Sequence, residues 1–117
     1  MEKVKKKCQF CTMNRLELLL QLLEEQPTDA FTLFALAKEY EKTNDSENAL
    51  RYYLKLREIN PNYVGLYYHL GKLQELLGNP ATAIATYKEG MVVAKAAKDM
   101  HAYGELNGAR MIIDDED

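Results

Sequence analysis

An internal repeat with a spacing of 34 residues runs through this chain and narrows the possible folds more than any other feature. Seven residues of the first copy are matched by a similar or equivalent residue 34 positions later. The pairs are Pro27 with Pro61, Leu36 with Leu70, Ala37 with Gly71, Asn44 with Gly78, Ala49 with Ala83, Leu50 with Ile84, and Tyr53 with Tyr87. This period is typical of a helix–turn–helix unit stacked on copies of itself. Stacked helical units form an extended concave groove rather than a closed pocket, so the repeat favours binding over catalysis.

The size and charge of the chain exclude several classes of protein. Its 117 residues suffice for one domain with a real core but not for two. Hydrophobic residues make up 47% and charged residues 28%, which excludes a disordered chain. No run approaches the roughly 20 apolar residues of a membrane span. The net charge of −3 gives nothing to attract phosphate backbones or anionic lipid, so we expect neither a nucleic acid nor a membrane as partner.

The first twelve residues differ in pattern from the rest. Residues 1–12 are basic and show no amphipathic period, so we expect a disordered extension, with Met13 as a candidate for the biological start. The segment also lacks the apolar run and cleavage site of a signal peptide. Cys8 and Cys11 form a single CxxC without the second ligand pair that a structural zinc site needs. We therefore expect no metal or cofactor, and a cytoplasmic location because no disulfide framework is present.

Hydrophobic periodicity predicts an all-α protein of about six helices, with no strand pattern. The expected helices cover residues 14–26, 30–43, 46–59, 63–77, 80–98 and 99–113. Pro27 ends the first of them. Asn44 and Gly78 suit the left-handed residue that follows a helix. Asn79 and Pro80 are preferred residues for the N-cap and the first helical position.

Residues 30–63 and 64–97 resemble tetratricopeptide repeats. That family carries small residues at the eighth and twentieth positions, which let the two helices of a unit approach, and a large residue at the twenty-fourth. Here these positions hold Ala37, Ala49 and Tyr53, and then Gly71, Ala83 and Tyr87. The closing proline is Pro61 in the first unit, but Lys95 replaces it in the second. The resemblance implies helical hairpins stacked as a short right-handed α-solenoid.

The same resemblance organises the rest of the chain. Residues 14–26 look like the second helix of a unit that lacks its first helix, and a closing helix is expected at 99–113. These two helices would act as caps, because the end units of a repeat array otherwise expose apolar faces. We therefore expect one domain over residues 13–113, followed by an acidic tail at 114–117.

The resemblance also implies a binding surface. In the family, the inner surface comes mainly from six positions of each unit's first helix. Carried over, these are Phe31, Phe34, Ala35, Lys38, Glu41 and Lys42, and then Gly65, Tyr68, His69, Lys72, Glu75 and Leu76. The candidate binding residues among them are Phe31, Phe34, Lys38, Glu41, Lys42, Tyr68, His69, Lys72 and Glu75. Two aromatic anchors beside two lysines suit an extended peptide with an apolar side chain and an acidic group. The alternative is that Phe31 and Phe34 pack against the first helix as core.

No catalytic constellation is visible in the sequence. His69 has no carboxylate at helical spacing toward it and no nucleophile nearby. Family members that bind the C-terminal carboxylate of heat-shock chaperones carry Lys and Asn at the fifth and ninth positions of their first unit. Phe34 and Lys38 stand there instead, which disfavours that function. We predict a protein–protein interaction module without catalysis, whose partner the sequence does not identify.

The alternative function is self-association through the helix at 14–26. Four leucines of this helix share one arc, while Leu18 and Leu22 lie further around it, so that the leucines span about half the circumference. This apolar surface is wider than the stripe that a helix buries against one neighbour. We expect Leu18 and Leu22 to face outward and to mediate a weak homodimer. In the competing outcome, residues 1–12 fold back over these leucines through Phe10.

Overall fold

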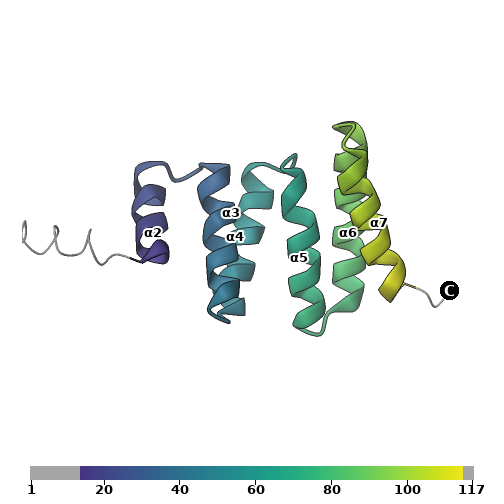
Figure 1. Cartoon of the computed structure of the whole chain (residues 1–117), viewed down its shortest axis with the longest axis horizontal. Coiled ribbons are helices and arrows are strands. Elements are labelled where there is room, and N and C mark those ends of the chain that lie inside the picture. The colour runs from purple at the N-terminus through teal and green to yellow at the C-terminus, as the bar shows by residue number, and fades with distance from the viewer. Residues whose placement is uncertain (1–13, 115–117) are drawn as a thin grey trace, which may run out of the picture.

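The computed structural model describes residues 14–114, which contain six α-helices and no strand (Figure 1). The helices are α2 (Arg15–Glu25), α3 (Ala30–Lys42), α4 (Ser46–Ile59), α5 (Val64–Leu76), α6 (Pro80–Ala96) and α7 (Met100–Ile113). The predicted basic extension, Met13, the cysteine pair and residues 115–117 lie outside the described residues. The predictions about them stay predictions.

The helices lie side by side in a row from α2 to α7 (Figure 1). The strongest packing is within hairpins, α3 with α4 and α5 with α6. At one end α2 packs on α3, and at the other α7 packs on α6 and also contacts α5. This arrangement confirms the predicted all-α fold of stacked helical hairpins. None of the helices within residues 14–114 is long and apolar enough to cross a membrane.

Local sequence signals explain where most helices begin and end. Asn14 caps α2 with a capping box, in which its side chain accepts from the Glu17 amide at 2.8 Å. Asn44 and Gly78 adopt φ angles of 63° and 85°, the left-handed conformation that was expected after α3 and α5. Lys98 also adopts a positive φ of 61°, so α6 ends at Ala96 instead of continuing into Lys98. The other helices begin or end within one residue of their predicted bounds.

Small residues allow the two helices of each unit to approach closely. Ala49 and Ala83 are fully buried, as the repeat pattern predicts. Gly71 lies against the ring of Tyr87, where a Cβ atom would overlap the ring carbons. Gly90 lies equally close to Tyr67, which packs the hairpin α5–α6 at a second point. In the α5–α6 hairpin, large aromatic side chains therefore pack closely on glycine, and buried leucines make up much of the remaining core.

The α2 helix forms one end of the row. Leu19 is buried against the rest of the domain, with only 4% of its surface exposed. Leu18 and Leu22 remain 41% and 42% exposed, which confirms that these two leucines face outward. The homodimer predicted from them stays a prediction.

Candidate binding groove

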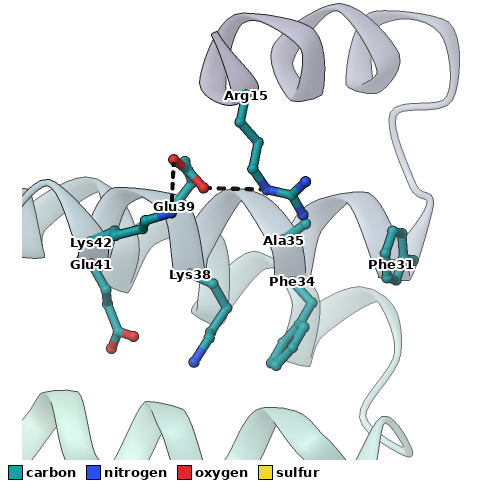
Figure 2. Close-up of a pocket in the computed structure, with 8 residues that line it drawn as sticks. All are labelled: Arg15, Phe31, Phe34, Ala35, Lys38, Glu39, Glu41 and Lys42. Carbon is teal, nitrogen blue, oxygen red and sulfur yellow. Dashed lines mark ion pairs between the residues drawn. The ribbon is translucent and has the colours of Figure 1, made fainter.

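A cleft of about 530 Å³ lies along α3 (Figure 2). Five predicted binding residues line it, and Ala35, Arg15 and Glu39 complete the lining. The five are Phe31, Phe34, Lys38, Glu41 and Lys42. In Figure 2 the side chains of Phe34, Lys38 and Glu41 point to the same side of α3, away from α2. They follow one another at helical spacings of four and three residues, which places them on one face of the helix.

The two phenylalanines have different environments. Phe31 is 64% exposed at one end of the cleft, so it is not a core residue. Phe34 is half-buried, and its ring centroid lies 6.2 Å from Tyr53, 5.4 Å from Tyr63 and 5.5 Å from His69. These contacts come from α4, α5 and the turn before α5, so Phe34 does not pack on α2 as the core interpretation supposed. Phe34 presents one side to the groove and is held in place by the other.

Lys38 and His69 connect the first helices of the two units. The Lys38 Nζ atom lies 3.3 Å from His69 Nδ1, and the lysine side chain is exposed. Burial lowers the pKa of His69, and the charge of Lys38 lowers it further, while Glu105 acts in the opposite direction. A neutral His69 accepts a hydrogen bond from the ammonium group at Nδ1. This contact fixes the position of a positive charge beside the Phe34 ring.

A second aromatic–cation pair lies one unit further on. Tyr68 is half-buried, with its ring centroid 5.6 Å from His69 and 6.5 Å from Tyr87. The Lys72 ammonium lies 6.0 Å from the Tyr68 ring centroid, at the limit of a cation–π contact. Tyr68 and Lys72 occupy on α5 the repeat positions that Phe34 and Lys38 occupy on α3.

The two groove glutamates are tied to buried tyrosines, a feature that the sequence reasoning missed. The Tyr53 hydroxyl donates to Glu41 Oε1 at 3.2 Å, and the Tyr87 hydroxyl donates to Glu75 Oε2 at 2.5 Å. Burial raises the pKa of Tyr53 and of Tyr87, and it also raises the pKa of Glu41. The pattern carried a signal, because a glutamate precedes a tyrosine by 12 residues in both units. The carboxylates are therefore positioned by the core as well as exposed to the groove.

Glu39 joins α2 to α3 at the edge of the cleft. Arg15 Nε lies 3.3 Å from Glu39 Oε1, and Lys42 Nζ lies 4.0 Å from Glu39 Oε2 (Figure 2). Sequence reasoning named Lys42 but not Arg15 or Glu39, because the contact crosses between two helices. Lys42 is therefore partly neutralised, whereas Lys38 and Lys72 form no ion pair with a carboxylate among residues 14–114.

The structure brings the predicted residues together in two rows. The α3 row lines the cleft, and the α5 row of Tyr68, His69, Lys72 and Glu75 continues beside it through the contacts of His69. Across the described part of the chain, no cluster of three His, Cys, Asp or Glu side chains is arranged to hold a metal ion.

The repeats themselves decide the family. The family model described as tetratricopeptide repeat matches residues 32–63 and 64–91, just over half of the chain. The chain belongs to the tetratricopeptide repeat family. This confirms the resemblance seen in the sequence.

Solved structures agree with the tetratricopeptide repeat assignment. The crystal structure of a tetratricopeptide repeat domain protein from Salinibacter ruber is 39% identical over 76% of this chain and 99% of that chain, with a TM-score of 0.72. A solution structure from the same organism gives 39% identity, coverages of 79% and 93%, and a TM-score of 0.74. A Bordetella parapertussis protein is 23% identical over 90% of this chain and 91% of that chain; its TM-score of 0.77 shows likeness of fold alone. No curated protein matches the chain at a significant level.

Membership of this family indicates a general type of function. Tetratricopeptide repeats form a non-catalytic scaffold that binds protein partners. The prediction of an interaction module is supported to that extent.

Proposed function

We propose that this domain binds an extended peptide segment of a partner protein along the inner surfaces of α3 and α5. The observation that supports this best is the arrangement around His69. The half-buried Phe34 ring and the Lys38 ammonium, both from the first unit, each contact His69 of the second unit. An apolar side chain of the peptide packs on Phe34 or Tyr68. An acidic side chain pairs with Lys38 or Lys72, which are free of carboxylate partners within residues 14–114.

The two groove glutamates add hydrogen-bond acceptors beside the lysines. Glu41 and Glu75 each accept a tyrosine hydroxyl, which leaves further acceptor sites on each carboxylate for a backbone amide of the peptide. Because both pairs recur at the spacing of the repeat, a peptide that crosses the units meets the same set of groups twice. This repetition favours an extended ligand over a compact one.

A comparison of captured proteins tests the proposal. Tagged wild-type domain should enrich one or more proteins from extracts of the source cells, and the Tyr68→Ala, Lys72→Ala variant and the Lys38→Ala variant should lose them. The matched control is Lys88→Ala, which removes an exposed lysine from α6. Equal capture by all four proteins would place the binding surface outside the groove.

Self-association is the second candidate function. The observation that favours it is the exposure of Leu18 and Leu22 on α2. This surface is distinct from the residues that line the cleft, so both functions are compatible in one molecule. A cytoplasmic location would suit either function and remains part of the proposal.

A further inference from the structure

The face of α2 that exposes Leu18 and Leu22 also carries Arg15 and Glu25, and all four side chains are exposed, with Arg15 also reaching Glu39 of α3 at the edge of the cleft. At about 100° per residue they fall within an arc of about 80° on the helix. The rest of the helix packs into the domain through the buried Leu19, which borders the stripe, and through the partly buried Leu16, Leu20 and Leu23. We call the four residues the outer stripe of α2.

The complete repeat unit shows what normally covers such a stripe. Thirty-four residues on, the outer stripe corresponds to Ala49, Tyr52, Leu56 and Ile59 of α4. Ala49 and Leu56 are 0% exposed and Tyr52 is 8% exposed. Tyr52 stacks on Tyr40 of α3, with ring centroids 5.6 Å apart. In a complete unit, therefore, an antiparallel first helix packs over this face.

The sequence that precedes α2 lacks the pattern of such a first helix. At the spacing of the repeat, Glu2, Lys3 and Lys6 stand where the first unit has Leu36, Ala37 and Tyr40. These are the positions at which the first unit carries apolar, small and aromatic residues. Charged side chains there do not supply the apolar face that the outer stripe would need.

The stripe is complementary to itself in an antiparallel pair. If two α2 helices cross about a two-fold axis on the stripe side, at the height of Leu20 along the helix, Leu18 faces Leu22 of the partner subunit, and Arg15 faces Glu25 of the partner subunit. Both contacts then occur twice, because each pair of positions is centred on Leu20. Arg15 pairs with Glu39 through Nε at 3.3 Å, and its side chain is still 59% exposed, so the guanidinium has donors for a second carboxylate.

We propose that α2 of a second copy of this chain occupies this face, in an antiparallel two-fold dimer with leucines at the centre and two Arg–Glu pairs at the ends. The partner helix runs antiparallel to α2, as the first helix of a complete unit does to its second helix. The inference develops self-association, the second candidate function, and does not depend on peptide binding in the groove.

The other end of the domain, α7, carries both polar and apolar exposed groups. On α7, Arg110 donates to Asn107 at 2.8 Å and contacts Asp114 at 3.1 Å. The α7 helix also exposes Met100, Met111 and Ile112, so the closed pair is expected from the symmetry of the α2 contact and not from the polarity of α7. An isologous contact through α2 alone is closed. Stable interfaces bury about 1,200–2,000 Å², and a contact through one pair of short helices is smaller. The dissociation constant of the dimer should therefore lie at tens to hundreds of micromolar.

Sedimentation equilibrium of the full chain tests the contact. The wild type should dimerise over tens to hundreds of micromolar, and the Leu18→Glu, Leu22→Glu variant should stay monomeric with unchanged helicity. Leu76→Glu is the matched control, because Leu76 is 76% exposed on α5, and it should dimerise as the wild type does. A wild type that is monomeric throughout this range overturns the proposal, as does a dimer that survives both leucine substitutions.

Charge reversal tests the register. At low salt, Arg15→Glu and Glu25→Arg should each weaken the homodimer by about tenfold, because each substitution sets like charges opposite one another twice. An equal mixture of the two variants should recover the wild-type affinity, since every contact then joins opposite charges. Single variants that dimerise as well as the wild type contradict the antiparallel arrangement. A mixture that binds more tightly than the wild type contradicts it too, because a parallel pair would behave in that way.

Discussion

The position of several groove side chains depends on partners that are distant in sequence. His69 holds Lys38 from the neighbouring unit, and Tyr53 and Tyr87 each hold a glutamate from the first helix of their own unit. The residue types on the inner face could be predicted from the repeat. The hydrogen bonds could not, because they depend on how far a tyrosine hydroxyl extends beyond the core that its ring fills.

The pKa of His69 should lie below its ordinary value of 6.5, because burial and Lys38 both disfavour the protonated ring. The unfolded chain then binds the proton more readily, so the contribution of His69 to stability is present above about pH 6.5 and is lost as pH falls through the lowered pKa. An NMR titration of the His69 ring should show this. Lys38→Met should raise the pKa, whereas Lys88→Met should leave it unchanged. An unchanged His69 titration in Lys38→Met would refute the contact.

Two glycine substitutions should have opposite effects on stability. In Gly71→Ala the new Cβ atom would overlap the Tyr87 ring, so the free energy of unfolding should fall by about 1–3 kcal/mol or more. In Gly104→Ala the Cβ atom meets nothing within 4 Å, and the better helix propensity of alanine should raise it by about 0.5–1 kcal/mol. Urea denaturation of both variants measures the difference. Equal changes in the free energy of unfolding would show that the packing does not require glycine at position 71.

At the scale of helices, each hairpin depends on the crossing of its two members. Ala83 is fully buried between α5 and α6, so Ala83→Leu should overpack the crossing and lower the free energy of unfolding by about 1–3 kcal/mol. Ala85→Leu, at an exposed position of the same helix, is the control and should change stability little. Thermal unfolding by circular dichroism compares the two. A stable Ala83→Leu protein would count strongly against the repeat packing.

The helices were more predictable than their contacts for physical reasons. Apolar periodicity and residues such as Asn44 and Gly78 act locally, so they define helix ends before any tertiary contact is known. Lys98 was missed because lysine rarely adopts a positive φ, and nothing local indicates that the chain turns there. Arg15 was missed as a cleft residue because its contact with Glu39 crosses from α2 to α3.

At the scale of the whole molecule, the two ends of the row differ. The α7 end carries a hydrogen-bonded polar cluster around Arg110 as well as the exposed Met111 and Ile112, whereas the α2 end exposes Leu18 and Leu22. The groove lies between them on α3 and α5. The domain thus offers one surface to a peptide and a second surface to another molecule.

Residues 1–12 are expected to contribute little to this domain. A chain that begins at Met13 should match the full chain in helicity and in melting temperature, because α2 already has its own capping box at Asn14. Circular dichroism of the two chains makes the comparison. A clear loss of stability would show that the basic segment packs on the domain, and would give Cys8 and Cys11 a structural context.

Site-specific photocross-linking tests the central claim, partner binding in the groove, most directly. A photoreactive amino acid replaces Lys72 on the inner face of α5 in one protein and Lys88 on α6 in another, and each is irradiated in extracts of the source cells. The proposal predicts a discrete cross-linked partner from position 72 and none from position 88. A partner that cross-links from position 88 and not from position 72 would contradict it.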